Sequence, residues 1–191
     1  MKIFKRLPTT SLANVHNILC PARNKSIDLH SPALEVFTDF NTTWPLMIEQ
    51  GTGIEAAREA MKRTHVRLHL VIDQDEHFKG IITLSDLLSV KVMRARVRTG
   101  LGVDDLGVVD VMTRREALHA IEYKLFCNAR VGDILATMET YGHQHALVVD
   151  SEHDQVRGIV SSSDIARALH VPVNINERAT SFSDIYQAMR C

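Results

Sequence analysis

The sequence predicts an α/β (α+β) protein in which one small unit of helices and short strands occurs twice along the chain. Residues 53–73 align with residues 130–150 at a constant offset of 77 without a gap, so that Asp73 falls on Asp150. Within each copy, a helical hydrophobic period is followed by two short runs rich in β-branched and aliphatic residues. Because self-similarity of this kind marks a repeated structural unit, we expect two copies of one fold.

The first predicted helix of each copy is amphipathic. Ile54, Ala57 and Met61 recur at positions i, i+3 and i+7 with charged residues between them, which is the spacing of one buried helical stripe. The second copy repeats this spacing from Val131 to Met138. We expect each stripe to pack on the short sheet of its copy.

Two strands and a second helix follow each amphipathic helix. The runs LHLVID at 68–73 and HALVVD at 145–150 end at an Asp before polar residues, as a buried strand does on entering a turn. A further strand, FKGIIT at 78–83, corresponds to VRGIVS at 156–161 after a turn one residue longer. Each copy is therefore expected to place two helices on a short sheet.

The segments around the two copies set the predicted domain boundaries. The first strands are expected at 46–49 (LMIE) and 123–127 (YKLFC), and the helix after the first copy should run through KVMRARVR and end in TGLGVDDLG. We therefore divide the chain into an N-terminal extension 1–40, a first unit 41–99, a linker 100–109, a second unit 110–172 and a tail with a short helix, 173–191.

Composition and charge argue against several classes of function. The 22 basic and 23 acidic residues leave a net charge of −1, which gives no field suited to nucleic acid or to an anionic membrane. No stretch approaches the roughly 18 apolar residues of a membrane-spanning helix, and the N-terminus lacks the apolar run of a signal peptide. The three cysteines, Cys20, Cys127 and Cys191, are far apart and are expected as reduced thiols. We expect a cytoplasmic protein without membrane insertion or a nucleic-acid partner.

A G-h-h-[ST]-x-x-D segment, where h is hydrophobic, occurs once in each copy, as GIITLSD at 80–86 and GIVSSSD at 158–164. The glycine permits a close backbone approach, and the hydroxyl lies where the strand gives way to the helix. The carboxylate three residues later can accept hydrogen bonds from both ribose hydroxyls, while the hydroxyl and the helix amides can face phosphate. The alternative is that the Ser or Thr and the Asp only cap the helix.

The second copy is better equipped for a phosphate. Arg167 lies one helical turn after Asp164 and could reach a phosphate group, whereas the first copy has Ser89 at this position. Arg167 could equally be a solvated helix residue. The basic run Lys91, Arg94, Arg96 and Arg98 has the same two interpretations, a solvated connector helix or a face that reaches phosphate or a partner.

The duplicated pattern of a strand ending in Asp, a short loop and G-h-h-[ST]-x-x-D resembles the cystathionine-β-synthase (CBS) domain family. VVDVMT at 108–113 is also similar to the start of a CBS motif, and the resemblance covers roughly residues 40–170. It implies two motifs packed through their sheets into a pseudo-two-fold disc, a Bateman module, which commonly forms a homodimer. It also implies clefts for adenosine-containing ligands such as AMP, ADP, ATP or S-adenosylmethionine. The nucleotide-binding residues it implies are Gly80, Thr83, Asp86, Gly158, Ser161, Asp164 and Arg167.

We therefore expect a regulatory adenine-nucleotide sensor that acts on an unidentified effector protein and is not an enzyme. No catalytic motif is present and no cofactor is required, with AMP, ADP or ATP as the regulatory ligand. No metal site is expected, because the histidines do not recur at ligand spacing. The alternatives are a dimerisation or protein-interaction module that needs no ligand, and an enzyme with an unusual site in residues 1–40.

Overall fold

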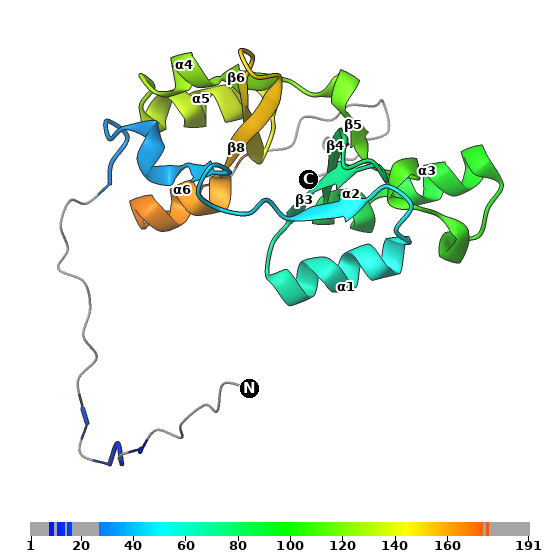
Figure 1. Ribbon diagram of the computed structural model, residues 1–191, viewed down its shortest axis with the longest axis horizontal. Coiled ribbons are helices and arrows are strands. Elements are labelled where there is room, and N and C mark those ends of the chain that lie inside the picture. Colours follow the sequence, from blue (N-terminus) through cyan, green and yellow to red (C-terminus); the bar gives the residue numbers. More distant parts are fainter. Residues whose placement is uncertain (1–7, 10, 14, 17–26, 174, 176–191) are drawn as a thin grey trace, which may run out of the picture.

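The computed structural model describes residues 8–9, 11–13, 15–16, 27–173 and 175, and consists of two halves, each a four-stranded sheet with helices (Figure 1). The strands are β1 (Thr38–Asp39), β2 (Met47–Glu49), β3 (Leu68–Ile72), β4 (Phe78–Thr83), β5 (Thr113–Arg114), β6 (Ala120–Glu122), β7 (His145–Asp150) and β8 (Gln155–Ser161). The α-helices are α1 (Ile54–Thr64), α2 (Leu84–Leu88), α3 (Val90–Thr99), α4 (Tyr123–Phe126), α5 (Val131–Tyr141) and α6 (Ser162–Leu169). Short 3-10 helices are η1 (Ala33–Val36), η2 (Val103–Asp105), η3 (Val108–Asp110) and η4 (Arg115–Ala117). The short helix predicted in the tail lies outside the described residues.

The repeated elements predicted from the sequence are confirmed. The strands β3 and β4 pair antiparallel, as do β7 and β8, and each pair shifts register once near its hairpin end. The predicted stripe of α1 is buried at Ile54, Ala57 and Met61. The equivalent stripe of α5 runs from Val131 to Met138. Each half therefore has its own hydrophobic core between helices and sheet.

The strand predicted at residues 123–127 is wrong. These residues begin the one-turn helix α4, which buries Phe126 in the second core, and the first strand of the second copy is instead β6. The segment between first strand and amphipathic helix comprises residues 50–53 in the first copy but 123–130 in the second. The constant offset of 77 therefore begins at the amphipathic helix and does not hold before it. Applying it to the residues before the helix places the first strand of the second copy too late in the sequence.

Each sheet is completed by a strand that precedes the other copy. The strand order is β2-β3-β4-β5 in one sheet and β1-β8-β7-β6 in the other. Thus β1 pairs with β8, and β5 pairs with β4. The cores follow the same exchange, because η1 buries Ala33 and Val36 in the second core and η3 buries Val108 in the first. We call β1 and β5 the exchanged strands.

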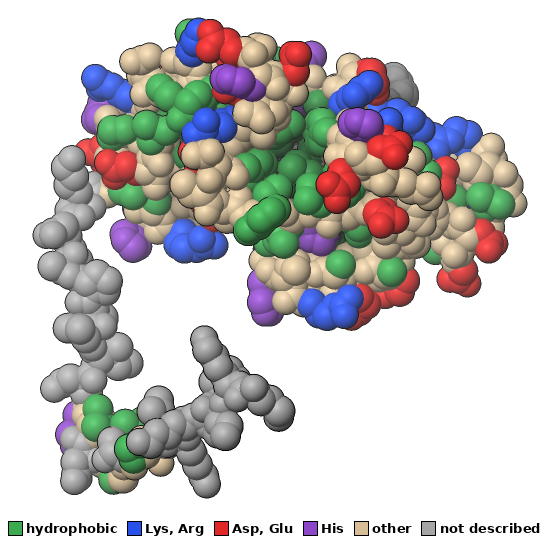
Figure 2. Space-filling view, viewed as in Figure 1, with side chains coloured by type: hydrophobic (Ala, Val, Ile, Leu, Met, Phe, Trp, Pro, Cys, Tyr) green, Lys and Arg blue, Asp and Glu red, His purple; other side chains and the backbone are tan. Residues whose placement is uncertain are grey.

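A groove lies between the two halves. Figure 2 shows hydrophobic side chains gathered between the halves, in line with a groove of about 930 Å³ lined by residues of both sheets. Residues 40–46 connect β1 in one sheet to β2 in the other and so cross this groove. Among the described residues, no helix is long and apolar enough to span a bilayer.

Candidate functional site

The first S/T-x-x-D segment lies at the junction of β4 and α2, where it forms a closed helix cap. The Thr83 hydroxyl accepts a hydrogen bond from the Asp86 amide at 3.1 Å and donates one to Asp86 Oδ2 at 2.7 Å. The same Oδ2 accepts the Thr83 amide at 2.9 Å, which completes a capping box. The other oxygen, Oδ1, is ion-paired with Lys91 from α3. The Asp86 side chain is only 10% exposed, and both of its oxygens are engaged within the protein.

The second segment, at the junction of β8 and α6, is more open. The Ser161 hydroxyl accepts the Asp164 amide at 3.0 Å and donates to Asp164 Oδ2 at 2.6 Å. Arg167 donates from a guanidinium nitrogen to Oδ1 at 2.9 Å. The side chains of Asp164 and Arg167 are 37% and 78% exposed, so their ion pair is in contact with solvent. An exposed pair of this kind contributes only about 0–1 kcal/mol, so a ligand can replace it at little cost.

The charges of Asp86 and Asp164 both affect the pKa of His145, a residue that was not among the predicted site residues. Burial lowers the pKa of His145 to about 4, while the charges of Asp164 and Asp86 raise it and that of Arg67 lowers it. His145 pairs with Ser161 across β7 and β8, just as Leu68 pairs with Thr83 across β3 and β4. The structure therefore brings both S/T-x-x-D segments, His145 and Arg67 into one region at the start of β3 and β7. The sequence could have indicated His145, because a hairpin of 145–150 and 155–161 places this residue opposite Ser161.

Gly80 and Gly158 lie within β4 and β8, where the exchanged strands pack against them. A Cβ atom built on Gly80 would stand 2.2 Å from the Thr113 carbonyl oxygen. One built on Gly158 would stand 2.3 Å from the Thr38 carbonyl oxygen. The backbone that approaches each glycine closely is therefore that of β5 or β1.

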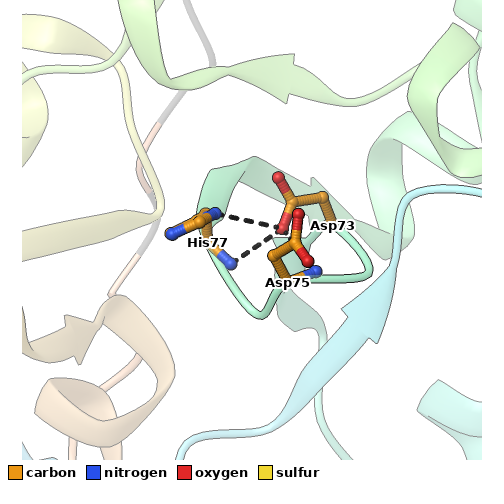
Figure 3. Close-up of side chains that lie close together, drawn as sticks. All are labelled: Asp73, Asp75 and His77. Atoms are coloured by element: carbon orange, nitrogen blue, oxygen red, sulfur yellow. Dashed lines mark hydrogen bonds and ion pairs between the residues drawn. The ribbon is translucent and has the colours of Figure 1, made fainter.

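The β3–β4 hairpin brings three potential ligand side chains together, Asp73, Asp75 and His77, whose ligand atoms lie within 4.8 Å of one another (Figure 3). The Asp73 carboxylate accepts the amides of Asp75 at 3.1 Å and His77 at 2.9 Å and pairs with Lys79 at 2.9 Å. Lys79 above all, and then the His77 amide, lower the pKa of Asp73 to about 2. Because turn amides and a lysine already engage Asp73, we assign the cluster to the hairpin turn.

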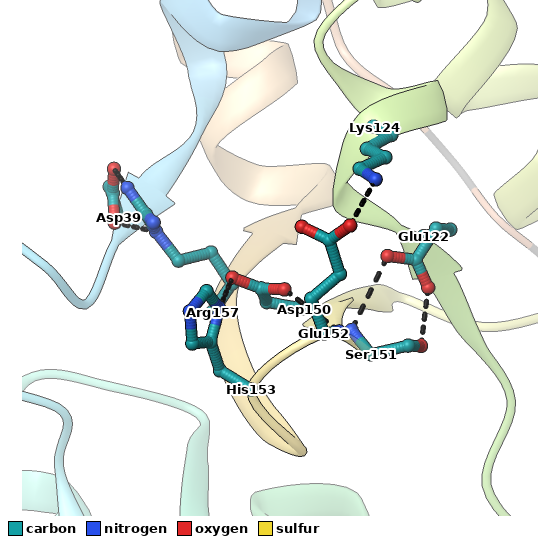
Figure 4. A network of polar contacts seen from close by, with 8 residues as sticks. All are labelled: Asp39, Glu122, Lys124, Asp150, Ser151, Glu152, His153 and Arg157. Carbon is teal, nitrogen blue, oxygen red and sulfur yellow. Dashed lines mark hydrogen bonds and ion pairs between the residues drawn. The ribbon is translucent and has the colours of Figure 1, made fainter.

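The second hairpin has a corresponding network (Figure 4). Asp150 accepts the Glu152 amide at 3.1 Å and lies 2.8 Å from His153 Nδ1, and this His153 contact is the main cause of its lowered pKa. Beside it, Arg157 of β8 binds both carboxylate oxygens of Asp39 at 2.8 and 2.9 Å, which lowers the pKa of Asp39. This bidentate pair fixes β1 on β8.

The groove between the halves is distinct from the S/T-x-x-D region. It lies at the hairpin ends of the strands, and its lining includes residues 40–45 together with side chains of both hairpins. None of the sequence-predicted site residues lines it. The structure therefore offers two separate regions between the halves, one at each end of the strands.

Comparison with known proteins supports the fold. The CBS domain family model matches residues 39–93 and 108–171, which together make up more than half of the chain. An uncharacterized conserved protein from Pyrococcus horikoshii is 24% identical, with a TM-score of 0.56 over 78% of this chain and 98% of that one. No curated protein matches the sequence.

Two solved structures with adenosine ligands share the fold. CBSX2 (Arabidopsis thaliana) in complex with AMP is 18% identical, with a TM-score of 0.51 over 72% of this chain and 95% of that one. The CBS domain pair of protein MJ0100, in complex with 5′-methylthioadenosine and S-adenosyl-L-methionine, is 18% identical, with a TM-score of 0.52 over 73% of this chain and 96% of that one.

Proposed function

The chain belongs to the CBS domain family, and on that premise we propose that it is a regulatory module that binds an adenosine-containing ligand through its S/T-x-x-D segments. AMP, ADP or ATP is the proposed ligand, and a separate effector protein is the proposed target. The solved CBS pairs that hold AMP, or 5′-methylthioadenosine and S-adenosyl-L-methionine, support the adenosine class.

The observation that carries the proposal is the state of Asp164. Its carboxylate is partly exposed and lies at the start of α6. Oδ2 accepts the Ser161 hydroxyl, and among the described residues Oδ1 is held only by the exposed Arg167. Ribose hydroxyls could donate to this carboxylate, and Arg167, once released, would be free to pair with a phosphate. Asp86 would first have to lose Lys91, so we propose that the second segment binds first.

Ligand binding would regulate by favouring one arrangement of the two halves over another. A ligand shifts such an equilibrium only as far as its affinities for the two arrangements differ. The S/T-x-x-D region is suited to this because the charges of Arg67 and Asp86, from the first half, reach His145 of the second half and affect its pKa.

Calorimetry and thermal-shift measurements with AMP, ADP, ATP, NADH and S-adenosylmethionine test the proposal. We expect at least one ligand to bind, and we expect Asp164→Ala to weaken that binding by about tenfold or more, the loss of a charge-assisted hydrogen bond. The Ser161 cap on the backbone amide of residue 164 survives this substitution, so the fold should be kept. The matched control is Asp133→Ala, which removes a capping carboxylate from the start of α5 and should leave binding unchanged. Absence of heat and of any thermal shift with all five ligands would exclude the proposal.

A ligand-independent interaction module is the second candidate, favoured by the exposed apolar face of α3. Val90, Met93 and Val97 recur along this helix and are 41%, 56% and 86% exposed. If this face mediates self-association, Val97→Glu should convert a dimer to a monomer in analytical ultracentrifugation without any nucleotide. Leu125→Glu, at an exposed leucine of the other half, is the matched control. A Val97→Glu protein that sediments like the wild type would exclude this candidate.

A further inference from the structure

The groove between the halves has an apolar floor. Leu70, Ile72, Val149 and Val156, from three strands of the two sheets, all line it. Side chains alternate along a strand, so the neighbours of these residues, such as Val71, point into the helix-covered core instead. A volume of about 930 Å³ is sufficient for a small organic molecule, since such pockets measure roughly 300–1,000 Å³.

Aromatic side chains stand along the same groove. Phe40 and Trp44 come from the segment that connects β1 to β2, and Phe78 comes from the start of β4. Trp44 is the single tryptophan of the chain and is 90% exposed. An exposed indole beside an apolar floor offers a flat face on which an aromatic ring or an organic cation can stack.

Two carboxylates without partners lie at the rim. Glu76 and Asp154 occupy corresponding positions at the tips of the two hairpins, and both have a left-handed backbone, with φ of 62° and 51°. Both are exposed and line the groove, and neither side chain has a hydrogen bond or ion pair with any described residue.

The other ionisable side chains of the lining have partners within the protein. Asp150 contacts His153, Arg115 is paired with Glu116, and His77 lies 3.6 Å from Asp73. The charge left for a ligand at the rim is therefore negative.

We propose that this groove is a second ligand site, for an amphipathic organic cation whose apolar body lies on the floor and whose positive group lies between Glu76 and Asp154. The site is independent of the S/T-x-x-D region, which lies at the other end of the strands. Aromatic faces and unpaired carboxylates both attract an organic cation, and the floor removes its apolar body from water. A nucleotide phosphate, by contrast, would be repelled at this rim.

Trp44 provides the readout, because its fluorescence as the single tryptophan reports directly on the groove. The probes are diphenylbutylammonium, diphenylbutanol and diphenylbutanoate, which share one apolar body and carry a positive, zero and negative charge. We expect saturable changes in Trp44 emission, with affinity falling in that order and the cation about tenfold tighter than the anion. Equal affinity for the cation and the anion, or no saturable change, would overturn the proposal.

Substitution at the rim locates the charge selectivity. The Glu76→Gln and Asp154→Asn double variant should lower the affinity for the cation by about tenfold, and that for the alcohol by less than about twofold. Asp75→Asn is the matched control, since Asp75 is exposed in the same hairpin but does not line the groove. A double variant that binds the cation like the wild type would refute the assignment of the rim.

Competition with AMP separates this site from the nucleotide proposal. We expect the cation to bind equally in the presence and absence of saturating AMP, and in Asp164→Ala. If AMP displaces the cation and Asp164→Ala weakens it, the groove is part of the nucleotide site and no second site exists. If AMP fails to bind while the cation still does, the nucleotide proposal falls and the groove proposal stands.

Discussion

His145 is a position in the candidate site at which the two copies differ in chemistry. Its counterpart in the first copy is Leu68, at the same place beside the S/T-x-x-D segment. Burial holds the pKa of His145 at about 4. The position that is an apolar leucine in the first copy is thus a titratable histidine in the second.

We expect His145 to make the folded protein sensitive to mild acid. The unfolded chain takes up this proton near pH 6.5 and the folded chain only near pH 4, so stability is lost as the pH falls through that window. The loss is at most about 1.4 kcal/mol per pH unit and levels off below the folded pKa. Burial also lowers the pKa of His69, which therefore contributes in the same direction.

His145→Leu should reduce this acid sensitivity, with Leu68 as the precedent within the chain. The measurement is urea unfolding at about pH 7 and about pH 5 for both proteins. Since both retain His69, the difference isolates His145. Equal losses of unfolding free energy in wild type and variant would show that folding does not lower the pKa of His145.

The sequence nominated Asp86 and Asp164 and an arginine beside the second of them, but not the pairing of the first with a lysine. The S/T-x-x-D pattern is identical at Asp86 and Asp164, and the repeat aligned Arg167 with Ser89. The partner that closes the first site, Lys91, lies beyond the break between α2 and α3. Whether a basic residue of that run faces solvent or a buried carboxylate depends on this break, which periodicity does not show.

At the scale of elements, the exchanged strands depend on two glycines. Gly80→Ala and Gly158→Ala should each destabilise the protein by about 2–4 kcal/mol, because the new methyl group meets a backbone carbonyl that cannot rotate away. Urea unfolding measures the loss. Gly51→Ala is the control, since nothing lies within 4 Å of its Cβ position, and it should change stability by less than about 0.5 kcal/mol. A Gly80→Ala protein as stable as this control would mean that β5 does not pack on β4.

Local patterns predicted the helices and the central strands, but not the exchange. The antiparallel pairs β3–β4 and β7–β8 are local hairpins with clear hydrophobic runs. The pairing of β1 with β8 joins residues more than a hundred positions apart in the sequence. The hydrophobic periodicity of a short segment cannot predict such a pairing. A signal was nevertheless present, because ALEVFT at 33–38 resembles VVDVMT at 108–113.

At the scale of the whole molecule, the exchange means that the first half is built from one continuous stretch of chain and the second half from two separate stretches. All strands and buried core residues of the first half lie within residues 40–114. The second half needs β1 and η1, from residues 33–39, in addition to the chain after residue 114. Cutting the chain after residue 114 therefore leaves one complete sheet and one incomplete sheet.

We expect a fragment of residues 40–114 to fold alone, and a fragment of residues 115–175 to fold only when a peptide of residues 27–39 is added. Circular dichroism and amide exchange at Ile159, which pairs with Thr38, follow the recovery. A peptide with Val36→Asp, which places a charge at a buried position, is the control and should give no recovery. A fragment of 115–175 that is equally stable with and without the peptide would contradict the expectation.

The exchanged strands also have a consequence for how such a chain can arise and associate. A protein with a single copy of this unit could complete its sheet only with a strand from a second molecule, so it would be an obligate dimer. Joining two copies in one chain replaces that association with an intramolecular one, at an effective concentration of roughly millimolar. The same geometry allows two whole chains to trade their segments 33–39 and form a domain-swapped dimer. Such a dimer would separate only after partial unfolding, unlike a dimer held by surface contacts alone.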